Sequence, residues 1–455
     1  MKSNPQIMPW SGHLKATLLL GLPIVGSHLA QMLITLTDTV MMGWYGIDEL
    51  AAVVLASSIF FVLFIVGSGF AFAIMPMAAS AEGEGDTKQV RRVVRMGLWI
   101  SLIYCAIMMP LLWNFEAILL AIGQAPEIAK LAQTYMHVVQ WSMFPAMLVM
   151  VLKSYLSALE RVNLVLWVTI LAAILNALVN YALIFGNWGF PEMGVRGAAI
   201  ASILSTLLSF GFIALYVYLL PELKEYAIFT RFWRSDWPAF WEVFRLGWPI
   251  GATMLAETGL FSATAILMGW LGTTELATHG IAIQIASMAF VIYLGFSTAG
   301  TVRAGRALGR GDIAGIWRVA VTVLGLQLFV AALVIVMFLA IPETLIGAFL
   351  TDGSVEASDI VAYGVGLLLV TALFQIPDGV QVVALSLLRG IKDTKVPMIL
   401  AVISYWVIGM PVAYILGFVW GYGGVGIWAG LVIGLTVAAV TMLWRFVWLM
   451  RKMNR

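Results

Sequence analysis

Twelve long runs of mainly apolar residues occupy most of the chain, and this feature limits its fold more than any other. A helix that crosses the hydrocarbon core of a bilayer needs ~20 mainly apolar residues. Charged residues make up only 11% of the chain, whereas a soluble globular domain carries about 25%. The pattern predicts an all-α membrane protein with twelve transmembrane helices. We expect these helices at residues 14–42, 50–79, 93–113, 128–159, 164–185, 195–220, 240–270, 276–302, 313–340, 360–388, 396–419 and 425–449.

The basic residues between these runs gather on one side of the membrane. Lysine and arginine are enriched in the cytoplasmic loops of membrane proteins. If the N-terminus is cytoplasmic, all of the 25 basic residues except Lys130 and Arg196 fall on the cytoplasmic side. This segregation predicts an even number of crossings, with both termini in the cytoplasm.

The two halves of the chain repeat one plan. Three motifs return at one constant offset: LGLPI (20–24) as LGWPI (246–250), MGWYGIDELA (42–51) as MGWLGTTELA (268–277), and AEGEGD (81–86) as ALGRGD (307–312). Each half holds six expected helices and starts on the same side, so an axis along the membrane normal should relate the halves. The repeat predicts two pseudo-symmetric six-helix lobes around a central cleft.

The lobe boundaries follow from the polar connections. We assign residues 1–220 to an N-lobe with helices 1–6, residues 221–239 to a cytoplasmic linker, and residues 240–455 to a C-lobe with helices 7–12. Two-lobed membrane proteins are usually transporters that hold a substrate near the midplane while the lobes rock. A channel would not need this duplication, although the sequence does not exclude one.

Three acidic residues lie inside the expected helices rather than at their ends. They are Asp38, Glu257 and Asp378. A carboxylate in the middle of a bilayer costs ~2.5–3.5 kcal/mol on insertion scales, and such residues usually line ion or proton paths. The alternative is a protonated carboxyl group that only hydrogen-bonds a neighbouring helix.

The repeat shows that the acids are placed asymmetrically. Polar residues form a stripe along one helix face in each half: Gln31, Thr35 and Asp38 in the N-lobe, and Glu257 and Thr264 in the C-lobe. Thr264 takes the position of Asp38, and Gln31 takes the position of Glu257. The two lobes therefore cannot contain the same kind of cation site. We expect reversible protonation in the N-lobe, and a carboxylate pair suited to a metal cation such as Na⁺ in the C-lobe.

Polar and kinking residues accompany Asp38. Asn176 and Asn180 are spaced to lie on one helix face, where they could ligate or hydrogen-bond Asp38, or join helices as buried asparagines often do. Pro23 lies inside the first helix, where it frees a backbone carbonyl and favours a kink. Such a bend suits a helix that changes shape on protonation, and a static kink is the alternative.

Five segments together resemble the multidrug and toxic compound extrusion family, in its NorM-like branch, and the resemblance runs from about residue 14 to 450. They are TDTVMMGW around Asp38, LNALVNY around Asn176 and Asn180, AETGLF around Glu257, ATHGIAIQ around His279, and PDGVQVVALSLLRGIKD around Asp378. The resemblance implies export of small organic cations, such as dyes and fluoroquinolones, by alternating access and exchange for Na⁺ or H⁺. It also implies a location in the bacterial inner membrane, contact with membrane lipid, a monomer and no cofactor.

The resemblance also assigns residues. Asp38 with Asn176 and Asn180 match the proton-linked cluster of the family's N-lobe, and Glu257 with Asp378 match its C-lobe cation site, here assigned to Na⁺. We expect supporting roles for Pro23, His279, Gln284 and Phe374. Three departures stand out: Phe374 replaces a tyrosine of some relatives, Gly280 replaces a frequent glutamine, and Asn180 replaces an aspartate of other branches.

Other functions fit the sequence less well. A flippase or exporter of lipid-linked or polar metabolites would need basic groups inside its cavity to hold phosphates, and the lysines and arginines are expected near the membrane faces. A membrane enzyme would need a nucleophile–base pair or a metal cluster, which four histidines and one cysteine do not suggest. The net charge of +2 gives no reason to expect a nucleic-acid partner.

Overall fold

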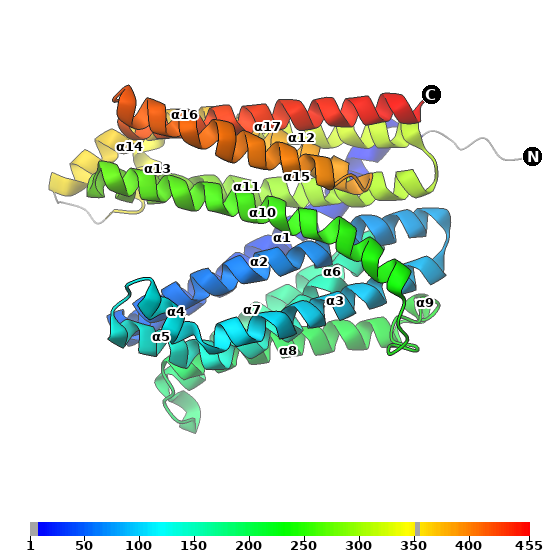
Figure 1. Ribbon diagram of the computed structural model, residues 1–455, viewed down its shortest axis with the longest axis horizontal. Helices are drawn as coiled ribbons and strands as arrows, with labels where there is room; N and C mark the ends of the chain where they lie inside the picture. Colours follow the sequence, from blue (N-terminus) through cyan, green and yellow to red (C-terminus); the bar gives the residue numbers. More distant parts are fainter. Residues whose placement is uncertain (1–7, 351–354) are drawn as a thin grey trace, which may run out of the picture. The chain divides into compact units, whose positions relative to one another are not determined.

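The structure is a computed structural model that describes residues 8–350 and 355–455 (Figure 1). Within these residues the chain is mostly helical, with no strand, and twelve helical segments are long and apolar enough to cross a membrane. The predicted all-α class and helix count are therefore confirmed. Residues 1–7, which the prediction assigns to the N-lobe and the cytoplasmic N-terminus, lie outside the described residues.

The helices follow the expected order, and two of the spans are divided. The spanning segments are α1 (Trp10–Tyr45), α2 (Ile47–Glu84), α3 (Thr87–Trp113), α5 with α6 (Pro126–Val139, Met143–Ala158), α7 (Val162–Phe185), α8 (Val195–Leu219), α10 (Trp237–Leu271), α11 (Thr273–Gly309), α12 (Ile313–Ala340), α14 (Val355–Gly390), α15 to η4 (Lys395–Val419) and α17 (Gly423–Met453). Short helices α4 (Phe115–Ala121), α9 (Pro221–Lys224) and α13 (Pro342–Gly347) lie between them.

The chain forms two compact units, which we describe separately. The N-unit comprises residues 26–251, and the C-unit comprises the residues up to Val25 together with 252–455. Each boundary falls inside a helix, two residues after Pro23 in α1 and two residues after Pro249 in α10. These boundaries differ from the division expected at residues 220 and 240, because the first part of α10 packs with the N-unit and the first part of α1 with the C-unit.

The N-unit is built around α2 and α6. Helix α2 packs along α3, α5 and α6, while α8 packs against α5, α6 and α7. Met42, Leu112, Phe115 and Leu119 are fully or almost fully buried in its core, together with the free cysteine Cys105. These large side chains meet small residues on neighbouring helices, which lets the helices pack closely.

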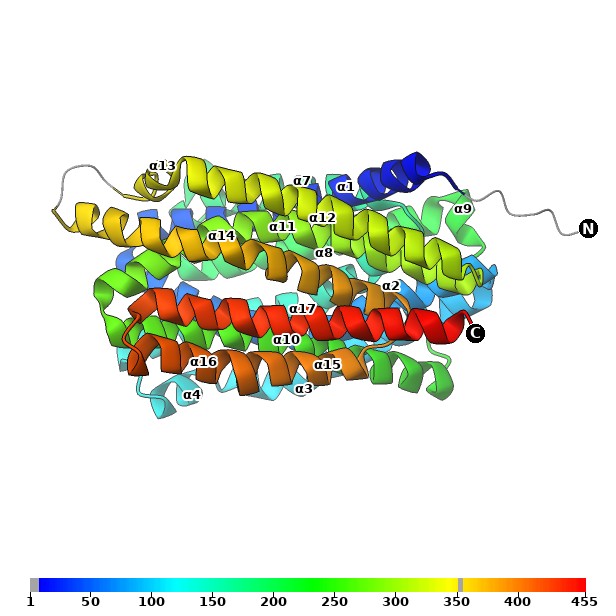
Figure 2. The ribbon, with the colours of Figure 1, turned by 90° about the horizontal axis from the view of Figure 1, so that it is seen from above.

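The C-unit is centred on α14. Helices α11, α12 and α17 all pack against it, and α12, α14 and α17 run along one another in Figure 2. Helix α17 presents Gly430 to the backbone of Ala413, where a side chain would collide with the Ala413 backbone. Close approach of this kind is typical of small residues in membrane helices.

The eleventh span contains two π-helical segments. It consists of α15 (Lys395–Val402), the π-helical segment η3 (Ile403–Gly409), α16 (Met410–Tyr414) and a second π-helical segment, η4 (Ile415–Val419). A π-helix fits more residues into a turn, and so turns the following side chains relative to an α-helical path. Segment η3 carries Tyr405, which is buried.

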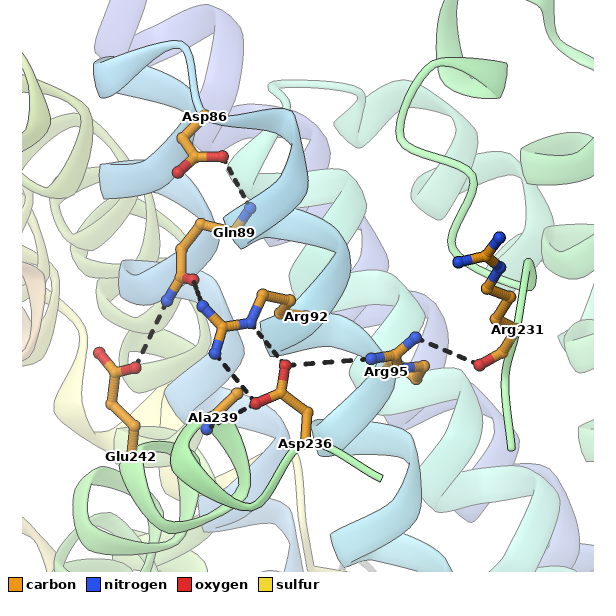
Figure 3. Close-up of polar contacts among 8 residues, drawn as sticks. All are labelled: Asp86, Gln89, Arg92, Arg95, Arg231, Asp236, Ala239 and Glu242. Carbon is orange, nitrogen blue, oxygen red and sulfur yellow. Dashed lines mark hydrogen bonds and ion pairs between the residues drawn. The ribbon is translucent and has the colours of Figure 1, made fainter. Parts of the chain in front are cut away.

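The polar segment before α10 is fastened to α3 within the N-unit (Figure 3). Both oxygens of Asp236 accept hydrogen bonds from Arg92, at 2.5 and 2.9 Å, and Arg95 donates to the carbonyl of Arg231 at 3.2 Å. Asp236 also accepts from the backbone of Ala239 in the first turn of α10. The hydrogen bond from Arg92 holds the pKa of Asp236 below its usual range. The expected linker is thus bound to α3 of the N-unit.

Candidate functional site

In the N-unit, α1 and α7 bring Asp38 together with two buried asparagines. Asn180 donates through Nδ2 to Oδ1 of Asp38 at 2.5 Å and to Oδ1 of Asn176 at 3.2 Å. The spacing of the two asparagines places them one turn apart on the same face of α7. The predicted cluster of Asp38, Asn176 and Asn180 is therefore present as one hydrogen-bonded group.

Two polar atoms of this group keep unused hydrogen-bonding capacity. Within the described residues, Asn176 Nδ2 and Asn180 Oδ1 are buried and have no hydrogen-bond partner. A buried polar atom without a partner costs free energy, so the group favours something that supplies one. Tyr135 of α5 interacts electrostatically with Asp38 from another helix. The arrangement is suited to a proton, water or small cation at the carboxylate.

The other two members of the α1 stripe do not join this group. Gln31 and Thr35 are exposed, and their side chains make no hydrogen bond to any part of the chain that the structure describes. Their positions on the stripe follow the predicted spacing. Any role for them would depend on a bound substrate or ion rather than on the Asp38 cluster itself.

In the C-unit, three helical segments meet in a hydrogen-bonded chain that ends on Glu257 of α10. Gln381 of α14 donates through Nε2 to Oε1 of Glu257 at 3.0 Å. The hydroxyl group of Tyr405, in η3, donates to Oε1 of the same Gln381 at 2.9 Å. Gln381 and Tyr405 are buried, whereas Glu257 is only partly buried. One oxygen of the carboxylate is therefore held by the Gln381 amide, and the Glu257 side chain keeps some accessible surface.

Asp378 lies one helical turn before Gln381 and is more isolated. It is 2% exposed, and its Oδ1 has no hydrogen-bond partner within the described residues. It interacts electrostatically with Glu257 and with Tyr293 of α11. Two carboxylates in a low-dielectric environment repel each other unless a proton or cation intervenes. The pair is suited to bind one of these.

Amide and hydroxyl groups surround the carboxylate pair. Tyr293 donates to Oε1 of Gln375 at 2.9 Å, and Gln375 Nε2 has no partner. Neither polar atom of Gln327 on α12 has one either, among the residues that the structure describes. An ideal Cβ on Gly379 would lie 2.8 Å from Gln327 Nε2, which puts this amide beside the turn that carries Asp378.

A hard cation such as Na⁺ prefers oxygen ligands. Glu257 and Asp378 offer carboxylates, and Gln327 offers an amide oxygen without a hydrogen-bond partner in the described residues. The amide oxygens of Gln375 and Gln381 already accept from tyrosine hydroxyl groups. No group of three or more His, Cys, Asp or Glu side chains suited to a metal ion occurs in the part of the chain described. A metal ion here would therefore need neutral oxygens to complete its coordination, and the amide oxygen of Gln327 is one such ligand.

The remaining predicted residues lie elsewhere. Thr264 is fully buried and its hydroxyl donates to the Leu260 carbonyl of its own helix, so it does not reach the carboxylates. Gln284 is exposed and makes no side-chain hydrogen bond within the described residues. Pro23 is inside α1, within the part that belongs to the C-unit. A bend at this proline stays a prediction.

His279 and Phe374 form an aromatic contact with α17. Trp428 donates through Nε1 to Nδ1 of His279 at 3.1 Å, and the two rings meet edge to face. Phe374 packs edge to face on both Trp428 and Phe261. The histidine therefore has a structural hydrogen-bonding role, and the phenyl ring in place of a tyrosine adds packing rather than a polar ligand.

The sequence analysis missed the neutral members of the C-unit cluster. Thr371, Gln375, Asp378 and Gln381 follow one another at spacings of four, three and three residues, and all are almost fully buried. This spacing is the signature of one helix face and could have been found by following the polar residues around Asp378. Tyr405 carried no such signal, because its direction depends on the π-helical winding of η3.

Most of the chain is similar to a known protein family. The family model MatE matches residues 23–182 and 249–415, which is most of the chain. The chain belongs to the MatE family. The two matched segments each contain an acidic cluster: Asp38 with Asn176 and Asn180 in the first, and Glu257 with Asp378 in the second.

Relatives of the MatE chain match it from end to end. A probable multidrug resistance protein NorM of Rhizobium meliloti (strain 1021) is 48% identical over 98% of this chain and 95% of its own. A protein of the same description from Agrobacterium fabrum is 45% identical over 97% of this chain and 95% of its own. The alignments span both units, so the chain matches these relatives as a whole.

Solved structures of the MatE type share the fold. A MATE protein in complex with MaL6 superposes with a TM-score of 0.87 at 22% identity, covering 97% of each chain. The outward-facing form of a multidrug resistance MATE family transporter gives the same TM-score and identity and covers both chains fully. At this identity the likeness supports the fold of this MatE protein and not its substrate or ion.

Proposed function

We propose that this protein exports small organic cations, such as drugs and dyes, in exchange for Na⁺ or H⁺. Membership of the MatE family places the chain among multi-pass membrane transporters rather than enzymes. The NorM relatives that match it are described as probable multidrug resistance proteins. The proposal adds the coupling ion, the exchange mechanism, and a location in the bacterial inner membrane with cytoplasmic termini.

One observation carries the exchange mechanism: each unit holds an acidic cluster with buried polar members, and the two clusters differ in composition. In the N-unit a single carboxylate, Asp38, is bound by Asn180, which suits reversible protonation. In the C-unit the pair of Glu257 and Asp378 is lined by buried amides with unused oxygens or nitrogens. A cation or proton that relieves repulsion in this pair would change the relative stability of the conformations between which a transporter alternates.

The energy available from one ion suits this task. A Na⁺ ion or proton that enters down a potential of 100 mV supplies ~2.3 kcal/mol, before any concentration gradient is counted. For a substrate without net charge this corresponds to a gradient of about fiftyfold. One-for-one exchange with a monovalent cationic drug moves no net charge, so there the concentration gradient of the ion must supply the free energy.

Ethidium efflux from proteoliposomes under separately imposed gradients tests the proposal. An inward Na⁺ gradient and an inward proton gradient are applied one at a time, with and without a membrane potential. We expect one gradient to accelerate efflux against the leak of protein-free vesicles. Efflux that responds to neither gradient would reject exchange. A purely potential-driven response that persists without either ion would do the same.

A further inference from the structure

A second polar group lies in the N-unit, at the end of the α1 and α7 stripes away from Asp38. His28 precedes Gln31, Thr35 and Asp38 on the same face of α1, at spacings of three, four and three residues. Thr169 precedes Asn176 by two turns on the same face of α7 and is buried. Ten residues of α-helix rise about 15 Å, so His28 and Asp38 mark opposite ends of one polar path.

Lys153 of α6 completes this second group. Its Nζ donates to Oγ1 of Thr169 at 2.9 Å, and Thr169 donates in turn to the carbonyl of Val165. His28 lies close enough to Lys153 to interact with it electrostatically. The side chains of Lys153 and His28 are partly buried, so both retain some accessible surface. The ammonium group of Lys153, five residues before the end of α6, is thus bound to α7.

The ammonium group of Lys153 has more capacity than the chain uses. An ammonium carries three donors, and one of them serves Thr169. No carboxylate forms an ion pair with Lys153 within residues 8–350 and 355–455. A charge held away from bulk water without a counter-ion is costly, and inside membrane helices such groups usually serve a ligand or an ion.

Comparison of the two halves shows that a basic residue without a carboxylate partner is particular to the N-unit. Helix α14 is the fourth span of its half, as α5 with α6 is of the other half, and its Arg389 interacts electrostatically with Glu257. The N-unit has Gln31 at the position of Glu257, and an amide supplies no negative charge. The basic group of the C-unit therefore has a counter-ion inside the protein, while Lys153 does not.

We propose that Lys153, with His28 and Thr169 beside it, forms a subsite for the carboxylate of zwitterionic substrates. This inference rests on the proposed export function and names a substrate class for it. A single ammonium, oriented by Thr169 and with the imidazole of His28 nearby, matches one negative charge. A charge-assisted hydrogen bond to a carboxylate is stronger than one between neutral groups. The subsite leaves Asp38 free to exchange its proton while the substrate's anionic end is held elsewhere.

The test compares one molecule with and without its negative charge. Norfloxacin, a zwitterionic fluoroquinolone, and its methyl ester bind to the purified full-length protein in detergent, and fluorescence measures both affinities. For the wild type we expect the acid to bind about tenfold or more tightly than the ester. This ratio of the two affinities is measured on the wild type, so it does not depend on whether a variant folds. Equal affinities, or no binding of the acid, would overturn the proposal.

Variants then assign the preference to the lysine. Lys153→Met should bring the acid-to-ester ratio close to one while ethidium, a cation, still binds; Lys153→Arg should keep most of the ratio. Lys88→Met, which changes an exposed lysine in the first turn of α3, is the matched control and should leave the ratio as in the wild type. A ratio unchanged in Lys153→Met would overturn the proposal.

Two further outcomes are distinguished. Lipid phosphate is another monoanion, so ethidium efflux is also measured in vesicles of phosphatidylcholine with and without phosphatidylglycerol. If Lys153→Met abolishes a dependence on phosphatidylglycerol but leaves the acid-to-ester ratio intact, the ammonium binds lipid and the substrate subsite is rejected. The binding assay contains no ion gradient, so failure of ethidium export would count against the proposed function and not against the subsite.

Discussion

Tyr405 donates a hydrogen bond to Gln381 on the side of the amide opposite Glu257. A carboxylate can only accept hydrogen bonds, so it must meet the amide nitrogen, and the tyrosine hydroxyl must then meet the amide oxygen. Tyr405 in the π-helical segment η3 thereby determines which atom of the Gln381 amide faces Glu257 on α10.

Tyr405→Phe should weaken this hold without removing any charge. The Oε1 atom of Gln381 would lose its donor while buried, which costs about 1–3 kcal/mol of stability. We expect a lower melting temperature in detergent and a several-fold change in the concentration of the coupling ion that half-activates ethidium efflux. Tyr414→Phe, at an exposed tyrosine of the same span, is the control. Equal effects from both variants would contradict a role through Gln381.

Asp38→Asn should abolish ethidium export while the protein still reaches the membrane and folds. The amide can hydrogen-bond Asn180 but cannot bind and release a proton. Proteoliposome efflux measures the loss, and size-exclusion chromatography with thermal unfolding checks the fold. Asp48→Asn, at an exposed residue in the first turn of α2, should leave export unchanged. Export at the wild-type rate in Asp38→Asn would remove the carboxylate from the mechanism.

Asp378→Asn should alter ion dependence more than drug binding. The substitution removes one of two interacting charges in a buried site, so repulsion falls and a cation is bound less tightly. We expect the concentration of the coupling ion that half-activates efflux to rise at least tenfold. The ethidium affinity should stay within about twofold of the wild type. Glu343→Gln, at an exposed residue of α13, is the matched control. An unchanged ion response in both Asp378→Asn and Glu257→Gln would rule out this cation site.

The ion pair of Arg92 and Asp236 should stabilise the N-unit except in strong acid. Because the folded state holds the pKa of Asp236 below its usual value, the contribution is present above about pH 4 and is lost as the pH falls through the lowered pKa. Asp236→Asn should cost about 1 kcal/mol at pH 7, since the pair is partly exposed. Asparagine still caps α10, so this variant isolates the charge.

Thermal unfolding of both proteins between pH 7 and pH 3 checks that expectation. The difference in melting temperature between the wild type and Asp236→Asn should stay constant down to about pH 4 and become smaller below it. Asp236→Ala, which removes the cap as well, should be less stable than Asp236→Asn at every pH. A difference that already disappears near pH 6 would show that the carboxylate is not held in its charged form.

Gly430→Val should disrupt the packing of the C-unit. The substitution places a branched side chain against the backbone of Ala413, which cannot move aside as a flexible side chain would. We expect a loss of about 1–3 kcal/mol or more and poor recovery of folded protein. Gly325→Val, on α12 with open space around it, should be tolerated. Similar yields and melting temperatures for the two variants would contradict close backbone packing as the reason for this glycine.

The sequence alone determined the helical class, the number of spans and the position of the buried acids. These follow from local properties: the length of apolar runs, the cost of charge in lipid, and a repeat that can be read at one offset. The association of Asp38 with Asn176 and Asn180 was also predictable as one of two alternatives, because helical spacing defines which residues of α7 share a face.

Only the tertiary structure decided which helices meet and how the units divide. Tyr405 reaches Gln381 because η3 winds as a π-helix, and Lys153 meets Thr169 because α6 packs beside α7. The first part of α10 packs with the N-unit, where Asp236 is bonded to α3, although no local signal marks a boundary at Gly251. Contacts between distant segments depend on the summed packing of whole helices, and sequence periodicity records only which face of each helix is available.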